Sequence, residues 1–247
     1  MSFNESDYID WEDYMDDLRK HKFKEGYKPK HPILFDYYYM DDNEKEEFMK
    51  TYIDLDMYWA EKNKEWNYVI EEPIWEVYQF PLITEELSKM IVEEVEQFGI
   101  FLGNDNGPNR ETPYSTTDVG FNSIPGTKNY KDKPLSKFYY DIQQRYTKPI
   151  IEHVWKHKAK FFPPSWVVKY EPGGQDFLKP HYDASVCASI VSLNDNYKGG
   201  GTWFERQKTT LDREPGWCTI HPSQLTHRHA GRRVTEGKRF IIVTFID

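Results

Sequence analysis

The spacing of hydrophobic positions along the chain changes near residue 160. Before that point, apolar residues recur every three or four positions, which predicts amphipathic helices at 41–66, 84–98 and 135–155. Thr84 is a suitable N-cap for the second helix, and Gly99 follows its last apolar residue. Pro149 lies inside the third segment, where it predicts a bend.

After residue 160 the apolar runs become short and rich in β-branched or aromatic residues, with Gly, Pro and Asn between them. These features predict strands at 165–170, 186–193, 201–204, 216–220 and 239–246. Helices followed by a series of strands favour the α+β class, here with a double-stranded β-helix (jelly roll) core flanked by helices. The segment 103–118, rich in Gly, Asn and Pro, is predicted to be an irregular loop.

The acidic charge of the chain is concentrated in its first part. Residues 1–70 hold 18 acidic and 10 basic residues, whereas 71–247 hold 23 and 22, which together give the net charge of −9. We therefore expect an acidic helical extension at 1–70 and the jelly-roll domain at 71–247. The acidic balance argues against a protein that binds nucleic acid.

Long apolar stretches and abundant cysteines are both missing from the sequence. No stretch approaches the roughly 18 apolar residues that a membrane span needs, and the acidic N-terminus lacks the basic and apolar regions of a secretory signal. We therefore expect a soluble protein without a signal peptide. Cys187 and Cys218 are the only cysteines, which excludes a disulfide framework and a cysteine-based zinc cluster.

The sequence KPHYDAS contains the first candidate for chemistry. His181 and Asp183 are two residues apart, so in a strand their side chains would project from the same face. A third metal ligand is available from His221, His227 or His229 in IHPSQLTHRHAG. Two histidines and one carboxylate form the ligand set of non-haem Fe(II) oxygenases, which leaves adjacent positions on the metal for a 2-oxo acid and O2.

A 2-oxoglutarate cosubstrate also requires a cation for its distal carboxylate, and arginine binds carboxylates through two parallel hydrogen bonds. Arg239 lies ten residues after His229, across a turn that contains Gly231 and Gly237. This spacing predicts a hairpin that places Arg239 and His229 on neighbouring strands.

Several long motifs resemble one enzyme family. The segments VVKYEPGGQDFLKPHYDAS, NYKGGGTWF, GWCTIHPSQLTHRHAG and GKRFIIVTFID are similar to the C-terminal hydroxylase domain of procollagen lysyl hydroxylases, which are Fe(II)- and 2-oxoglutarate-dependent dioxygenases. The resemblance extends back through EVYQFPLITEELSKMIVEEVEQFG and TTDVGFNSI, and so covers about residues 72–247. The composition also resembles that of viral members of this family, which would act in the host cell, whereas other relatives are enzymes of the endoplasmic reticulum lumen.

The resemblance implies a role for five residues. His181, Asp183 and His229 match the iron ligands, Arg239 matches the 2-oxoglutarate anchor, and Tyr170 matches a tyrosine that forms a hydrogen bond to the cosubstrate. The implied cofactors are Fe(2+), 2-oxoglutarate, O2 and ascorbate. The implied partner is a collagen-like peptide, and relatives of this kind are expected to form homodimers.

The match is incomplete at a few positions. His227 would share a strand face with His229, so it remains an alternative ligand or a group that supports one. Ile190 stands where the family has an asparagine, which puts one polar contact to the cosubstrate in doubt, and Tyr182 replaces a common histidine. The run Gly199-Gly200-Gly201 matches the family and predicts a tight hairpin or a close backbone approach.

The implied reaction is hydroxylation of peptidyl lysine at C5 in Gly-X-Lys sequences. A peptidyl prolyl hydroxylase of the same superfamily and a non-catalytic jelly-roll scaffold remain as alternatives. A lysine substrate would bring its ammonium group close to the iron, where an unpaired charge costs several kcal/mol. We therefore expect an acidic partner, with Asp118 as the first candidate and Glu171 and Asp176 as the others.

Overall fold

The computed structural model describes residues 27–103, 116–127, 132–159 and 165–247. Its helices are α2 (Pro32–Asp36), η2 (Tyr37–Tyr39), α3 (Asp42–Tyr52), α4 (Leu55–Asn63), η3 (Trp66–Tyr68), α5 (Glu85–Phe98), η4 (Phe121–Ser123), α6 (Pro134–Ile142), the π-helical η5 (Gln143–Thr147) and α7 (Lys148–Trp155). Its strands are β1 (Glu71–Ile74), β2 (Val77–Pro81), β3 (Asp118–Gly120), β4 (Trp166–Tyr170), β5 (Leu178–His181), β6 (Cys187–Ser192), β7 (Lys198–Gly199), β8 (Thr202–Phe204), β9 (Thr209–Leu211), β10 (Trp217–Pro222), β11 (His229–Gly231), β12 (Val234–Glu236) and β13 (Arg239–Ile246). Most of the predicted loop 103–118 lies outside the described residues.

The first predicted helix differs from the sequence prediction. The single helix expected at 41–66 is two helices, α3 and α4, because the chain is extended at Ile53 and Asp54. The Asp54 side chain accepts hydrogen bonds from the amides of Asp56 and Met57 and so starts a new helix. The α5 prediction is confirmed, with Thr84 as N-cap and Gly99 in the left-handed region after its end.

The third predicted helix is confirmed in extent but is not continuous. The π-helical turn η5 separates α6 from α7, and Pro149 lies at the start of α7, where its missing amide hydrogen costs no helical bond. The departure from α-helical geometry therefore lies in the π-helical turn, before Pro149, rather than at the proline itself.

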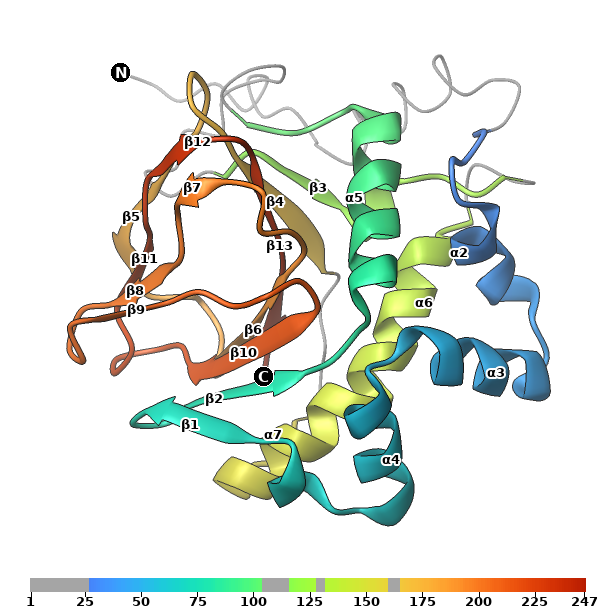
Figure 1. Ribbon diagram of the computed structural model, residues 1–247, viewed down its shortest axis with the longest axis horizontal. Helices are drawn as coiled ribbons and strands as arrows, with labels where there is room; N and C mark the ends of the chain where they lie inside the picture. The colour runs from blue at the N-terminus through green and yellow to red at the C-terminus, as the bar shows by residue number, and fades with distance from the viewer. Residues whose placement is uncertain (1–26, 104–115, 128–131, 160–164) are drawn as a thin grey trace, which may run out of the picture.

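Two antiparallel sheets form the jelly-roll core (Figure 1). The large sheet has the order β1-β2-β10-β6-β13-β4-β3, and the small sheet has the order β5-β11-β8-β9. A short pair, β12 and β7, closes one end of the gap between them. Helices α5 and α6 cover the outer face of the large sheet, while the small sheet has no helix on its outer side in Figure 1.

Alternation along β13 shows how the large sheet separates two cores. Phe240 and Ile242 point outward into the main hydrophobic cluster shared with the helices. Ile241 points inward, where it packs with Tyr170 of β4 and with other residues between the two sheets. Residues two apart on a strand share a face, so Arg239 at the start of β13 also faces the interior of the jelly roll.

The N-terminal helices pack into the main cluster. Phe35 and Phe48 belong to the same buried cluster as the helices that cover the large sheet, and Arg145 of η5 forms ion pairs with Glu46 and Glu61. Residues 1–26 of the expected acidic extension lie outside the described residues, so the division at residue 70 stays a prediction. Among the described residues, no helix combines the length and the apolar character needed to cross a membrane.

Candidate metal and cosubstrate site

The end of β5 and the start of β11 bring three candidate ligands together. His181 is directly opposite His229 in this antiparallel pair. Asp183 follows β5, with Oδ1 3.3 Å from His181 Nε2 and Oδ2 3.6 Å from His229 Nε2. One donor atom of each residue lies within 4.8 Å of those of the other two. Metal–ligand bonds of about 2.0–2.2 Å can therefore reach all three residues from one central ion after small side-chain movements.

Backbone carbonyls orient the rings of both histidines. Nδ1 of His181 is 2.8 Å from the carbonyl oxygen of Lys179, and Nδ1 of His229 is 3.0 Å from that of His227. A carbonyl only accepts, so Nδ1 is the donor in both rings, and Nε2 of each ring is directed toward Asp183. This is the second-sphere arrangement typical of metal-binding histidines.

Electrostatics also favour the protonation states that bind a cation. Burial lowers the pKa of His229 to about 3, so its imidazole is neutral. Burial alone would raise the pKa of Asp183, but the hydrogen bond from His181 and the neighbouring imidazoles lower it below its ordinary value. The site therefore presents the Asp183 carboxylate and the neutral His229 imidazole to a cation.

The other two candidate histidines have different surroundings. His221 on β10 is fully buried, and its Nε2 has no hydrogen-bond partner among the described residues but lies 3.9 Å from Oδ2 of Asp183. His227 lies outside the cluster: its ring stacks on Trp75 at 5.8 Å, and its Nε2 is 3.1 Å from the Trp75 carbonyl oxygen. His227 precedes β11 rather than sharing a strand face with His229.

Arg239 faces the same interior from the opposite sheet. It is the first residue of β13 and pairs with Tyr170 at the end of β4, so the hairpin predicted to place it beside His229 is wrong. The segment between them includes β12, which pairs with β7 and carries the chain from the small sheet to the large one. Both residues nevertheless line one cavity of about 460 Å³.

The surroundings of the Arg239 guanidinium favour the binding of an anion. Only 2% of the residue is exposed, and its Nε has no hydrogen-bond partner in the described part of the chain. Its guanidinium carbon lies 5.8 Å from the centre of the Tyr170 ring. A buried cation with a free donor is costly unless a ligand completes its hydrogen bonds, which indicates an anion site.

Tyr197 and Asp212 lie beside Arg239, and the sequence analysis did not identify either residue as part of the site. The Tyr197 hydroxyl lies 2.9 Å from both carboxylate oxygens of Asp212, and Oδ1 of Asp212 is 3.8 Å from Nη2 of Arg239. Gly200 is in the left-handed region with φ of 73°, and a Cβ there would lie 3.0 Å from Cδ of Arg239 and 2.8 Å from the Tyr197 ring. The close approach predicted for Gly199-Gly200-Gly201 is confirmed. In the sequence, this glycine run was the only indication that Arg239 and Tyr197 pack closely here.

The rest of the cavity is mainly apolar. Inward-facing residues of β4, β6 and β13 form its walls, including Trp166, Ile190, Ile241, Val243 and Phe245. Such walls exclude water and strengthen the interactions of the few polar groups they enclose. The cavity thus combines a cluster of possible metal ligands, a buried arginine with a free Nε and a low-polarity interior.

Asp118 is the first residue of β3 rather than the last residue of a loop. It lies opposite Val168, which lines the cavity, and directly opposed residues of an antiparallel pair share a face. The carboxylate accepts a hydrogen bond of 2.6 Å from Thr116, which also lines the cavity. The other two acids are in ion pairs, Glu171 with Lys169 and Asp176 with Arg233.

Solved structures with the same fold are 2-oxoglutarate hydroxylases. The viral collagen prolyl hydroxylase of Paramecium bursaria Chlorella virus-1, solved as its 2OG complex, matches 69% of this chain and 95% of its own with a TM-score of 0.51 at 16% identity. A prolyl-4-hydroxylase of Pseudomonas putida matches 69% of this chain and 91% of its own with a TM-score of 0.52 at 14% identity. The fold class is therefore the jelly roll of these hydroxylases.

Sequence comparison gives a more specific relationship. The chain is 34% identical over 204 residues to human procollagen-lysine,2-oxoglutarate 5-dioxygenase 1, which covers 76% of this chain and 27% of that protein. It is 32% identical over 186 residues to the multifunctional procollagen lysine hydroxylase and glycosyltransferase of Rattus norvegicus, which covers 72% and 24%. No protein-family model matches the chain. The resemblance is thus confirmed: the chain is a homologue of the procollagen lysyl hydroxylases and spans about a quarter of their length.

Proposed function

We propose that this protein hydroxylates peptidyl lysine at C5 in collagen-like Gly-X-Lys sequences, with Fe(II), 2-oxoglutarate and O2. The observation that carries the proposal is the meeting of the His181, Asp183 and His229 cluster with the buried Arg239, whose Nε is free, in one apolar cavity. The relationship to lysine dioxygenases supports the reaction class.

The proposed iron ligands are His181, Asp183 and His229. The fit rests on the donor set, since one nitrogen from each of two histidines and one carboxylate oxygen converge, and this is the combination that Fe(II) oxygenases use. His221 is a further donor, with Nε2 3.9 Å from Oδ2 of Asp183, and we assign it a supporting role because it is not in the group whose donor atoms all lie within 4.8 Å of one another. Fe(II), when bound, supplies the activation of O2 that is coupled to loss of CO2 from the 2-oxo acid.

Arg239 is the proposed anchor for the distal carboxylate of 2-oxoglutarate, with Tyr170 beside it. A planar guanidinium holds a carboxylate by two parallel bonds, and the buried free Nε supports this role. Burial raises the pKa of Tyr170 to about 12, so its hydroxyl stays protonated and can donate to the cosubstrate. Ile190 in the wall contributes an apolar contact where relatives were expected to have asparagine.

The deciding experiment mixes the purified protein with Fe(II), 2-oxoglutarate, ascorbate and a Gly-X-Lys peptide. A product heavier by about 16 Da, with the added mass on lysine and release of CO2, is the expected result. A matched Gly-X-Pro peptide tests the second candidate, peptidyl proline, which the similarity in fold to two prolyl hydroxylases favours. Absence of CO2 release and of any product with either peptide would favour the non-catalytic scaffold. Omission of ascorbate tests its expected role.

Replacing Tyr197 by phenylalanine is expected to weaken the proposed 2-oxoglutarate site. The variant loses the hydroxyl that holds the Asp212 carboxylate near Arg239. One such hydrogen bond is worth about 1 kcal/mol, which corresponds to a roughly fivefold higher KM for 2-oxoglutarate. The KM for peptide should change little, and an equal rise in both KM values would contradict a role specific to Arg239.

Replacing Asp118 by asparagine is expected to impair lysine hydroxylation selectively. The side chain faces the cavity and is 4% exposed, so it can pair with an ammonium group that would otherwise be desolvated alone. Loss of the charge should lower kcat/KM for the Lys peptide by about tenfold or more but spare iron and 2-oxoglutarate binding. Glu171→Gln is the matched control, since Glu171 pairs with Lys169. Normal turnover of the Lys peptide by Asp118→Asn would exclude this assignment.

Pairing of two copies is a further expectation, which comes from the resemblance alone. Light scattering should give twice the 29.6 kDa chain mass at micromolar concentration if the protein is a homodimer. The mass of a single chain under those conditions would refute it.

A further inference from the structure

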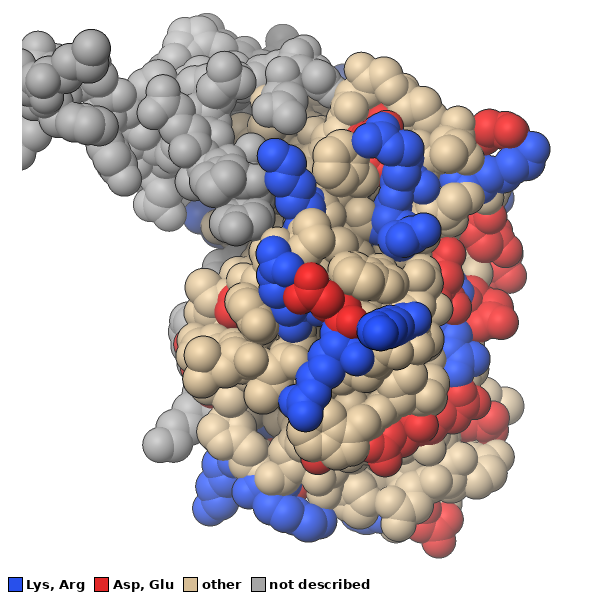
Figure 2. Space-filling view, turned by 90° about the vertical axis from the view of Figure 1, so that its left-hand side faces the viewer, with Lys and Arg blue, Asp and Glu red and all other residues tan. Residues whose placement is uncertain are grey.

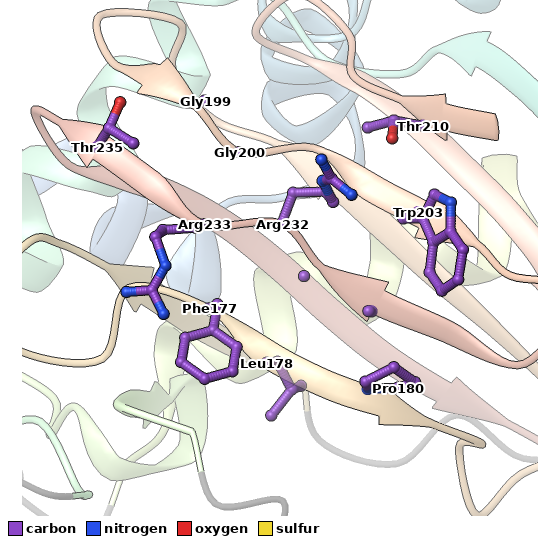
Figure 3. Close-up of a pocket in the computed structure, with 12 residues that line it drawn as sticks. Phe177, Leu178, Pro180, Gly199, Gly200, Trp203, Thr210, Arg232, Arg233 and Thr235 are labelled. Atoms are coloured by element: carbon purple, nitrogen blue, oxygen red, sulfur yellow. The ribbon is translucent and has the colours of Figure 1, made fainter. Parts of the chain in front are cut away.

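The small sheet carries a second cavity on its outer face, separate from the proposed iron site. This outer groove has a volume of about 700 Å³ and lies where β5, β8, β11 and the turn after β11 meet the glycine run (Figure 3). Its lining consists of Phe177, Leu178, Pro180, Gly199, Gly200, Trp203, Thr210, Ala230, Gly231, Arg232, Arg233 and Thr235. The proposed reaction assigns no role to the outer face of the small sheet.

Strand alternation explains how the groove acquires its apolar side chains. Pro180 and Ala230 each neighbour a proposed iron ligand in sequence, and consecutive strand residues point to opposite faces. Trp203 is directly opposite Ala230 in the β8–β11 pair, so both side chains share the outer face. The same pairing that points the ligands inward therefore points a tryptophan and a proline outward.

Aromatic groups are thus placed on two sides of the groove (Figure 3). The partly buried Trp203 lies on one side, and the Phe177 ring, with 38% of the residue exposed, lies beside Leu178 on the other. Exposed aromatic side chains beside a shallow cavity are the feature with which peptide-binding domains hold proline-rich chains in the polyproline II conformation.

The groove is also basic, in contrast to the net charge of −9. Figure 2 shows Lys and Arg side chains gathered near the middle of the face that carries the small sheet. Arg233 is held by Asp176 and lies over the Phe177 ring at 4.6 Å. Arg232 is exposed, and its guanidinium has no ion pair among the described residues. The guanidinium of Arg232 is therefore free to bind a carboxylate.

We propose that the outer groove binds a proline-containing, acidic, extended stretch of the same polypeptide whose lysine enters the iron site. This inference rests on the proposed function and adds a second point of substrate recognition. Trp203 and Phe177 would contact proline rings, and Arg232 would pair with an acidic side chain. Collagen-like sequences that are not yet folded adopt the polyproline II conformation readily, so they match both the rings and the shape.

One substrate peptide can reach both the outer groove and the iron-site cavity. Leu178 and Gly231 line the outer groove and the iron-site cavity alike, and β5 is an edge strand of the small sheet, so no further strand within the described residues blocks the path. A path over one edge of a sheet is on the order of 10–15 Å, which is about three to five residues at roughly 3.1 Å per residue. The two recognition points should therefore act on one peptide of about three collagen-like triplets.

The test compares three peptides around one Gly-X-Lys target: the target alone, the target extended at either end by Pro/Glu triplets, and the same extension with Ala/Gln in place of Pro/Glu. Wild-type protein should show a KM for a Pro/Glu peptide about tenfold below that of the other two, because a charge-assisted pair contributes about that factor. Arg232→Glu and Trp203→Leu should remove this advantage. Lys208→Glu, an equal charge change at an exposed turn of the same sheet, should keep it.

Direct binding separates this inference from the proposed function. A fluorescent Pro/Glu peptide without lysine should bind the metal-free protein, and Arg232→Glu should weaken that binding about tenfold or more, as measured by anisotropy. Hydroxylation with equal KM for all three peptides, or binding that Arg232→Glu leaves unchanged, would overturn the groove assignment while the enzyme proposal stands. Binding that depends on Arg232, in a protein that hydroxylates neither lysine nor proline, would overturn the proposed function and the link to its substrate. If light scattering shows that Arg232→Glu dissociates a dimer and the peptide does not bind, a second copy occupies the groove and the inference is wrong.

Discussion

Replacing His229 by alanine is expected to abolish hydroxylation and to lower iron affinity by more than a hundredfold. The residue supplies one of the three donor atoms that converge in the described part of the chain, and its neutral, buried imidazole needs no proton release before it binds. Loss of a group that merely supports a ligand typically costs about 10–100-fold, so loss of a ligand should cost more. Equilibrium dialysis of the protein against Fe(II) without oxygen, followed by metal analysis, measures the change without any dependence on turnover.

His227→Ala is the matched control for this prediction. His227 is buried but stacks on Trp75 and lies outside the cluster, so its loss should lower the free energy of unfolding by about 1–3 kcal/mol and leave iron bound. His221→Ala tests the remaining donor, whose Nε2 is 3.9 Å from Asp183. Retention of iron by His229→Ala together with its loss in His221→Ala would reverse the ligand assignment.

Five of the strands were accessible from sequence because they depend on local alternation, and His181 and Asp183 were found as a pair from their spacing, although Asp183 follows β5 instead of sharing a strand face with His181. His181 and Asp183 come from one short segment, and the apolar runs around 187–192 and 239–246 match buried strands of the large sheet. The long motifs made His229 the best third candidate. Period-two spacing fixes which side chains share a face, so these features need no knowledge of the other elements.

Contacts between distant elements were not accessible in this way. The order of strands in the two sheets decides that Arg239 lies across the cavity from His229 rather than beside it. Tyr197 and Asp212 approach Arg239 only because Gly200 leaves space for its side chain. Sequence spacing describes one strand at a time, whereas these contacts depend on the crossover through β12.

The break between α3 and α4 has a different origin. The apolar spacing continues across it, but the Asp54 carboxylate binds the amides of the following turn and makes a new helix start more favourable than continuation. A capping aspartate inside an apparently continuous pattern was the available signal. The same kind of local hydrogen bond also sets the α5 start at Thr84, where the prediction was correct.

Replacing Arg239 by lysine is expected to raise the KM for 2-oxoglutarate by about a hundredfold while iron affinity stays near that of the wild type. Lysine keeps the positive charge but loses the planar fork, and it places a strongly hydrated ammonium in a position that is 2% exposed. About 2–3 kcal/mol for a lost charge-assisted hydrogen bond in such an environment gives a factor of this size. The iron donors are on the opposite sheet and keep their carbonyl-bound tautomers, so metal binding should persist. Titration of 2-oxoglutarate at saturating peptide, with Fe(II) dialysis in parallel, measures both quantities. An unchanged KM would show that the distal carboxylate binds elsewhere, and a parallel loss of iron would show that the substitution disturbs the whole cavity rather than the anchor.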